Sequence, residues 1–202
     1  MKEQCNYSLI EKIYKEKSYL TRKDIDSQKI SSWFLTDYVR KNGLLKIAPG
    51  VYASEDFIVD EYFVLQKRYP KYIFSGLSSL YLLHLTDKIP INMYVTAPQG
   101  YNPSKLKREN LIIHKISNSE IYSLGIIEVK TIYGNIVKAY DKERTICDLI
   151  KYRDKYDSET FVKALRLFKE SNPNQIRLFR YAKTMKIEKK VYELMEVILN
   201  ED

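Results

Sequence analysis

Hydrophobic residues near the start of the chain recur with helical spacing and are interrupted by polar turns. Residues 6–17 and 30–41 each place apolar side chains three or four positions apart, which favours one buried face per helix. Between these segments, Thr21 and Asp24 have the form of a capping box, a pattern typical of a helix N-terminus. The pattern therefore predicts three helices, of which the middle one is very short.

Strand-like spacing follows these helices. Gly43 ends the third helix, because glycine readily adopts the left-handed conformation found after a helix C-terminus. Segments 44–47 and 51–53 are apolar and flank a Pro-Gly turn, so we expect a small β-hairpin. Three short helices closed by a hairpin form a winged helix-turn-helix, and we predict such a DNA-binding domain over residues 1–54.

The remaining residues, 55–202, predict a second domain in which short strands are followed by amphipathic helices. Expected helices cover 55–68, 76–85, 141–150, 158–170, 174–185 and 187–200, and expected strands cover 71–74, 92–96, 111–116, 126–130 and 136–140. Strands and helices grouped in this way predict an α+β fold with a helical C-terminal part.

Charge adds a class of partner to this fold. The 202 residues include 34 basic and 26 acidic side chains, for a net charge of +8 and a pI near 9.2. The excess lies at the two ends, in residues 1–54 and 151–202, so a polyanion is an expected partner. No apolar run approaches the roughly 20 residues of a membrane helix, and residues 1–6 lack an apolar signal-peptide core. We therefore expect a cytoplasmic protein with no membrane partner.

The third predicted helix carries the candidate DNA contacts. If its apolar stripe is buried, Ser32, Thr36 and Arg40 lie on the opposite face, where hydroxyls can approach bases and a guanidinium can bind phosphate. Asp37 would repel phosphate, and the turn before the helix lacks the glycine often found there. A protein-interaction module is therefore the alternative. The predicted DNA-binding residues are Arg22, Lys23, Lys29, Ser31, Ser32, Trp33, Thr36, Arg40, Lys41 and Lys46.

A second group of basic residues recurs every three positions in the C-terminal helices. Its members are Lys163, Arg166, Lys169, Arg177, Arg180, Lys183 and Lys186. Two interpretations remain open, a solvated helix face and a second patch that binds DNA or RNA.

Motifs for catalysis are incomplete. Glu128 and Lys130 at the end of an apolar strand resemble half of a metal-dependent nuclease site, but the upstream carboxylate that would complete it is missing. Phosphate-binding glycine loops and nucleophile elbows are also missing from the sequence. We predict that the protein is not an enzyme and has no cofactor or metal, with a nuclease that uses Glu128 and Lys130 as the alternative.

Histidines and cysteines do not combine into a metal site in the sequence. His84 and His114 are far apart, and we expect each to pack in the core or at its boundary. Cys5 and Cys147 have neither the number nor the spacing of a disulfide framework or a zinc site, so both are predicted to be free thiols.

The charged residues around 141–148 are interpreted as structural. Asp141 can cap a helix, and Arg144 and Asp148 can form an exposed i,i+4 pair, which would contribute about 0.3–0.5 kcal/mol. The predicted structural set is Asp141, Glu143, Arg144 and Asp148.

Several motifs, in order, carry a family resemblance that covers nearly the whole chain. They are Leu20–Ile25, Gly43–Leu45 and Pro49–Tyr52 in the first domain, then Phe74–His84, Asn92–Pro98, and Gly134–Leu149 with its Glu-Arg-Thr sequence. In these motifs and their spacing, the chain resembles the AbiEi family of antitoxins from abortive-infection toxin–antitoxin systems.

The resemblance implies a bacterial type IV antitoxin for phage resistance that neutralises a nucleotidyltransferase-like toxin encoded beside it. It also implies autorepression, in which the winged helix binds repeated operator sites and the C-terminal domain serves toxin neutralisation. We expect a monomer or weak dimer that binds paired half-sites on double-stranded DNA cooperatively. Trp33 and Phe34 make the third helix bulkier than is usual in the family, so base preference does not carry over. Direct contact with the toxin is left open, and a winged-helix regulator unrelated to toxins is a further alternative.

Overall fold

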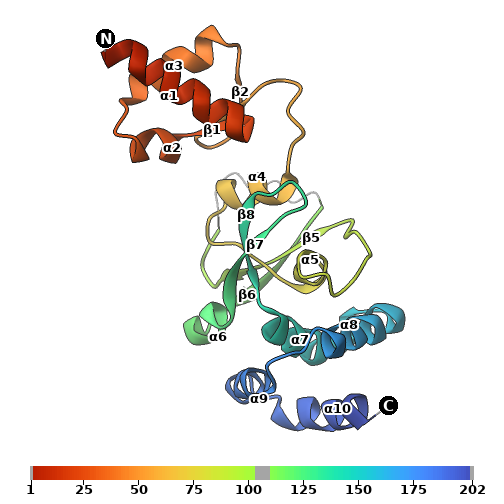
Figure 1. The fold of residues 1–202 in the computed structure, drawn as a ribbon. Coiled ribbons are helices and arrows are strands. Elements are labelled where there is room, and N and C mark those ends of the chain that lie inside the picture. Colours follow the sequence, from red (N-terminus) through yellow and green to blue (C-terminus); the bar gives the residue numbers. More distant parts are fainter. Residues whose placement is uncertain (1, 103–109, 201–202) are drawn as a thin grey trace. The chain divides into compact units, whose positions relative to one another are not determined.

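The computed structural model describes residues 2–102 and 110–200, and it divides the chain into two compact units, Met1–Arg68 and Tyr69–Asp202. Figure 1 shows the helices and strands of each unit. Both units combine helices with a small sheet, which confirms the predicted α+β class. Within the described residues, no helix combines the length and the apolar character needed to cross a bilayer.

The N-terminal unit packs its helices around a three-stranded antiparallel sheet of order β1-β3-β2 (Figure 1). Its elements are α1 (Lys2–Lys17), β1 (Tyr19–Thr21), α2 (Arg22–Ser27), α3 (Ser32–Lys41), β2 (Leu45–Ala48), β3 (Val51–Ala53) and α4 (Glu61–Arg68). The predicted helices and hairpin are present, whereas β1 was not expected from the sequence. A strand of three residues is too short to show alternation, and it forms here because Leu20 pairs with Tyr52 of β3.

The capping box predicted at α2 is confirmed. The backbone N–H of Asp24 donates to Thr21 Oγ1 at 3.1 Å, and the backbone N–H of Thr21 donates to Asp24 Oδ2 at 3.1 Å. This cap fixes the start of α2, so that Ile25 enters the core of the unit. The buried hydrophobic residues of that core are Ile10, Leu20, Ile25, Ile30, Leu35, Tyr38 and Leu44.

Helix α4 belongs to the N-terminal unit, although the sequence places a domain boundary between residues 54 and 55. Its Phe63 is buried, and the ring of Phe63 lies 5.1 Å from that of Tyr19 between centroids. The helix also contacts β2. The structure therefore moves the boundary to Arg68, because the apolar face of α4 is buried against this first sheet.

The C-terminal unit has a five-stranded mixed sheet of order β6-β5-β4-β8-β7. Its strands are β4 (Ile73–Phe74), β5 (Met93–Pro98), β6 (Leu111–Ile116), β7 (Ile126–Lys130) and β8 (Ile136–Tyr140). Strand β4 pairs parallel with β8 and antiparallel with β5, while β5 and β6 run parallel. The β7–β8 pair is antiparallel.

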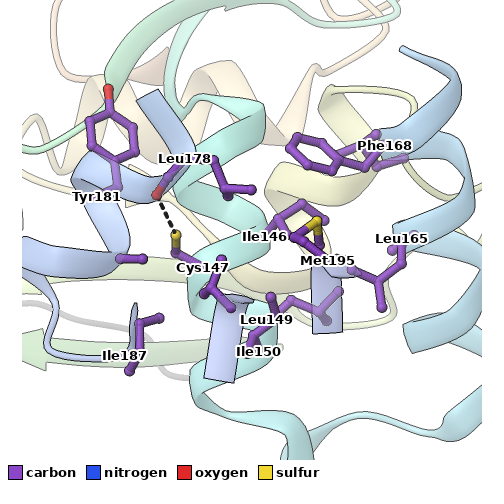
Figure 2. Close-up of a cluster of buried hydrophobic side chains, with 14 of the residues drawn as sticks. Ile146, Cys147, Leu149, Ile150, Leu165, Phe168, Leu178, Tyr181, Ile187 and Met195 are labelled. Atoms are coloured by element: carbon purple, nitrogen blue, oxygen red, sulfur yellow. Dashed lines mark hydrogen bonds between the residues drawn. The ribbon is translucent and has the colours of Figure 1, made fainter. Parts of the chain in front are cut away.

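Helices α5 and α7–α10 share a hydrophobic core, against which Ile127 and Val129 of β7 pack (Figures 1 and 2). The helices are α5 (Gly76–Leu82), α6 (Ser119–Ser123), α7 (Lys142–Lys151), the 3₁₀ turn η1 (Arg153–Lys155), α8 (Ser158–Glu170), α9 (Gln175–Thr184) and α10 (Glu188–Asn200). Helix α6 is not among the helices expected from the sequence, and the Asn118 side chain caps its start by accepting from the backbone N–H of Ile121.

Figure 2 shows the centre of this core, where Cys147 of α7 meets Leu178 of α9. The Cys147 thiol donates to the Leu178 carbonyl at 3.7 Å, and burial raises the pKa of that thiol to about 12. Cys5 is exposed, and both cysteines are free, as predicted. His84, in contrast, was expected to pack in or near the core, but it is exposed. It adopts the left-handed conformation, with a φ of 59°, directly after Leu83, the C-cap of α5.

Arg144 occupies the interior of the C-terminal unit, so the exposed pair expected from the sequence is wrong. Its Nε donates to Asp148 Oδ2 at 3.1 Å, and the guanidinium lies 4.3 Å from the centroid of the Tyr140 ring. Its Nη1 donates to the carbonyls of Ile121 and Leu124, and the distance to Leu124 is 3.2 Å. The side chain thus satisfies carbonyl groups around α6 while it is itself completely buried.

Asp141 and Glu143 connect the start of α7 to α9. The Tyr181 hydroxyl donates to Asp141 Oδ2 at 2.9 Å, and the Asn174 backbone N–H donates to Glu143 Oε1 at 2.8 Å. Burial raises the pKa of the Asp141 carboxyl. Gly125 makes room for the side chains of Asp141 and Arg144. A Cβ at position 125 would lie 2.8 Å from Arg144 Cβ and 3.0 Å from Asp141 Oδ1.

Replacement of Arg144 by Ala is expected to lower the free energy of unfolding by about 3–5 kcal/mol, because it leaves the buried Asp148 carboxylate without its partner. Urea denaturation followed by circular dichroism measures this loss. Arg166→Ala is the matched control, since Arg166 also has an i,i+4 acid but is exposed. The control should change stability by no more than ~0.5 kcal/mol, and equal losses in the two variants would contradict the prediction.

Candidate nucleic-acid interface

Helix α3 presents one polar face to solvent. Ser31 caps the helix by accepting from the Trp33 backbone N–H at 3.4 Å, while Leu35 and Tyr38 are buried in the core. Trp33, Thr36 and Arg40 are exposed, and Ser32 is half-buried. The apolar stripe and the opposite polar face predicted for this helix are therefore confirmed. Trp33 is 60% exposed, and its ring packs edge-on against Phe34 with centroids 5.0 Å apart.

Asp37 neutralises two of the predicted phosphate contacts. Its Oδ1 lies 2.8 Å from Arg40 Nη2, and its Oδ2 lies 2.7 Å from Lys41 Nζ. The Tyr7 hydroxyl of α1 also donates to this carboxylate. Hydrogen bonds from Lys41 and Tyr7 lower the pKa of Asp37 to about 2, so the carboxylate is ionised at neutral pH. Asp37 is therefore not a free negative charge on the helix, but it competes with phosphate for Arg40 and Lys41.

The turn between α2 and α3 forms without glycine because Lys29 adopts the left-handed conformation, with a φ of 55°. The backbone N–H of Ile30 donates to the Ile25 carbonyl at 3.1 Å, and that of Lys29 donates to the Asp26 carbonyl at 3.0 Å. These two bonds form a Schellman motif, in which the residue after the helix cap is usually glycine. Ile25 and Ile30 are both buried, and the Lys29 side chain remains exposed beside α3.

The β2–β3 hairpin lies next to the start of α2. The backbone N–H of Arg22 donates to the Gly50 carbonyl at 2.9 Å, so the hairpin turn contacts the first residue of that helix. Arg22, Lys23 and Lys46 are exposed. Lys46 pairs with Tyr52 of β3, and an irregularity in the register follows Lys46. The exposed basic groups of α2 and of the hairpin thus lie on contiguous elements of one unit.

The basic residues of the C-terminal helices do not form one continuous free set. Lys163 pairs with Asp87 at 2.6 Å, and Arg166 lies 3.8 Å from Glu170. Arg177 lies 3.5 Å from Glu143 Oε2 and 3.7 Å from Asp141 Oδ2. Exposed residues that form no ion pair within the described part of the chain are Arg180, Lys183 and Lys186. Lys169 is half-buried and does have an interaction partner.

Glu128 and Lys130 are exposed on β7, and Glu128 lies opposite Lys138 of β8 in the register of the sheet. Across residues 2–102 and 110–200, no group of three or more His, Cys, Asp or Glu side chains is arranged to hold a metal ion. His114 lies on β6, is half-buried, and forms a hydrogen bond with Tyr152 at 3.0 Å.

The contributions of Asp37 and Lys29 were missed in the sequence. The i,i+3 and i,i+4 spacing of Asp37 with Arg40 and Lys41 was visible, and it could have predicted the ion pairs. The hydrogen bond from Tyr7 to Asp37 could not be predicted, because it depends on how α1 packs against α3. The left-handed conformation of Lys29 could not be predicted from the sequence, because lysine rarely adopts it.

Comparison with known proteins gives a fold likeness alone. No family model and no curated protein matches the chain. A crystal structure of the RV2827C protein from Mycobacterium tuberculosis is similar, with a TM-score of 0.51 and 11% sequence identity. The match covers 89% of this chain and 71% of that one. At this identity the likeness concerns the fold and carries no function.

Lys29→Gly tests whether the left-handed conformation of Lys29 costs folding free energy. Glycine removes the cost of the left-handed conformation and should raise the free energy of unfolding by about 1 kcal/mol. Lys23→Gly, which places glycine inside α2, should instead lower it by about 1 kcal/mol. Thermal and urea unfolding measure both. A loss of stability in Lys29→Gly equal to that in Lys23→Gly would show that position 29 is not strained.

Proposed function

We propose that this protein is a non-enzymatic antitoxin and autorepressor whose N-terminal unit is a winged helix-turn-helix that binds operator DNA. One observation carries the DNA-binding part. The polar face of α3, which includes Trp33, Thr36 and Arg40, lies in the same unit as the exposed Lys29 turn and the Lys46 hairpin. A recognition helix flanked by basic groups is the arrangement with which winged helices enter the major groove and hold phosphates.

In this proposal the contacts divide by chemistry. Thr36 and the indole of Trp33 face the bases, because they are exposed, uncharged or aromatic, and carried on the face opposite the core. Lys29, Lys46 and Arg22 hold the phosphate backbone, with Lys23, Ser31 and Ser32 at the margins of the same surface. Arg40 and Lys41 contribute only to the extent that phosphate competes with Asp37 for them.

The antitoxin part of the proposal rests on the resemblance to the AbiEi family. Division into two compact units supports it, because DNA binding and neutralisation of a nucleotidyltransferase-like toxin can then be assigned to different parts of one chain. Repeated half-sites suit this arrangement, since one small domain gains specificity when a second copy binds beside it. Within this proposal, an additional contact with an anionic partner comes from the patch of Arg180, Lys183 and Lys186.

Arg40→Ala and Lys46→Ala are each expected to weaken binding to DNA from upstream of the gene and to reduce the salt slope by about one unit or less. Fluorescence anisotropy of labelled duplex across a salt series measures both quantities. Lys190→Ala, at an exposed lysine of α10 outside that patch, is the control in the C-terminal unit. Equal, weak binding to upstream and scrambled DNA would contradict the repressor proposal, and unchanged binding in both N-terminal variants would contradict the assigned surface.

Asp37→Asn is expected to act in the opposite direction. It removes the charge that holds Arg40 and Lys41 while keeping the size of the side chain, so affinity for duplex should rise and the salt dependence should become steeper. The same titration measures this change, with circular dichroism to verify the fold. A folded Asp37→Asn variant with weaker binding would show that the two ion pairs position the helix for DNA.

Toxin neutralisation is expected to survive the loss of DNA binding. Co-expression of the toxin encoded beside this gene should arrest growth, and the full-length protein should restore it. A Trp33→Ala, Lys46→Ala double variant should restore growth equally well while it no longer represses a reporter fused to the upstream DNA. Failure of the unaltered protein to restore growth would contradict the antitoxin proposal, and loss of rescue in the double variant would contradict the division between units.

A further inference from the structure

A half-open pocket lies in the C-terminal unit between the β5–β6 part of the sheet and the end of α7. Two parallel strands form its floor. Tyr94 and Thr96 of β5 pair with Ile112 and His114 of β6, and alternate residues of a strand point to the same face. The cavity has a volume of ≈ 70 Å³ and opens to solvent, so a ligand larger than this would extend out of it.

The opposite wall comes from the end of α7 and the turn after it. Asp148 and Tyr152 are four positions apart and line the pocket together, followed by Lys155 and Tyr156. The start of α5 closes one side, where a Cβ on Gly76 would lie 3.1 Å from the Tyr156 hydroxyl. Absence of that Cβ lets the ring of Tyr156 line the pocket beside the α5 start.

Three tyrosine rings make this pocket suitable for a flat ligand. Tyr94, Tyr152 and Tyr156 line it, and the Tyr152 hydroxyl forms a 3.0 Å hydrogen bond with Nε2 of His114. The rings of Tyr152 and His114 are 4.9 Å apart between centroids. Burial lowers the pKa of His114, so its imidazole is neutral at pH 7. Aromatic faces of this kind stack on bases and other planar rings.

Asp148 supplies an unused acceptor in the lining of the pocket. The residue is 8% exposed, and its Oδ2 accepts from Arg144 Nε at 3.1 Å. Among the described residues, Oδ1 has no hydrogen-bond partner, although the side chain lines the pocket. A carboxylate oxygen that lines a pocket can accept from an N–H donor, so the edge of the ligand beside Asp148 should carry an amino group.

Positive charge beside the Tyr152 ring determines which other group the ligand should carry. Lys155 Nζ and Lys151 Nζ lie 4.9 Å and 5.7 Å from the centroid of the Tyr152 ring. Asp148 is already paired with Arg144, so these ammonium groups leave an excess of positive charge. These ammonium groups would repel an organic cation placed among the three tyrosines. They favour a ligand whose flat ring carries an anionic group.

The geometry points to a nucleotide-binding site: a free nucleotide places its amino-bearing base between the tyrosines, donates from the amino group to Asp148, and holds its phosphate near Lys155. This assignment is independent of DNA binding by the N-terminal unit, and it concerns only residues of the C-terminal unit.

Isothermal titration calorimetry of the full chain with matched nucleotides tests the site. CMP and UMP differ by an amino group against a carbonyl, and GMP and IMP differ by one amino group. We expect CMP and GMP to bind roughly tenfold more tightly than UMP and IMP, because each adds one hydrogen bond to a charged acceptor. Ribose 5-phosphate, which lacks the base, should give no measurable binding.

Two variants connect this preference to the residues. Asp148→Asn should abolish the preference for CMP over UMP, because an amide can donate to the carbonyl as well as accept from the amino group. Lys155→Ala should weaken CMP roughly fivefold more than it weakens cytidine, since the phosphate contact is lost for CMP alone, whereas a change at the Tyr152 ring affects both ligands. Lys183→Ala is the control for loss of one exposed lysine in the same unit. If Asp148→Asn fails to fold, the exposed Lys155 still provides the test.

Absence of binding by all four nucleotides would overturn the proposal. Equal affinities within both matched pairs, or equal effects of Lys155→Ala and Lys183→Ala, would also overturn it. Binding of single-stranded oligonucleotides that depends on Lys155, with no binding of mononucleotides, would assign the pocket to a nucleic-acid strand and reject the free nucleotide. DNA binding through Lys46 can succeed or fail separately, so the two proposals are distinguishable.

Discussion

The buried guanidinium of Arg144 is the interaction on which the C-terminal unit depends. One side chain pairs with Asp148, stacks on Tyr140 and donates to two carbonyls around α6. Its Nη2 has no hydrogen-bond partner in the described part of the chain, so part of the desolvation cost is not recovered. The same group holds one oxygen of Asp148, which leaves the other free to act at the pocket. Stability of the core and chemistry of the pocket are therefore connected through a single ion pair.

The N-terminal unit shows the same connection between folding and charge. Lys29 and Asp37 each serve the local structure, one in a left-handed turn and the other as an acceptor for Tyr7, Arg40 and Lys41. Both also change the positive charge that α3 and its flanks can offer. A phosphate that approaches this surface meets Lys29 directly but must displace a carboxylate from Arg40. The binding energy of the unit is therefore not a sum over its basic residues.

Periodicity in the sequence was sufficient for several strands and for one long helix, but it placed the start of α1 four residues too late, at residue 6, and that of α4 six residues too early, at residue 55. Strands β6, β7 and β8 and helix α8 have the bounds that alternation and helical spacing predicted. The failures have physical causes. Strand β1 exists only through its pairing with β3, and His84 is exposed at a left-handed position that hydrophobic spacing does not reveal. Arg144 looked like a surface residue because nothing local to α7 indicates that carbonyls of α6 need a donor. The pocket was missed for the same reason, since its residues come from β5, β6 and α7 and meet only in the folded unit.

The exposure of Trp33 has a practical consequence. It is the single tryptophan of the chain, it is 60% exposed, and it lies on the polar side of α3. Its fluorescence is therefore a built-in optical reporter that describes the N-terminal unit alone. A shift of tryptophan emission on addition of a ligand therefore assigns the event to this unit, whereas tyrosines lie in both units and do not distinguish them. The protein thus carries its own label for events in the N-terminal unit, without chemical modification.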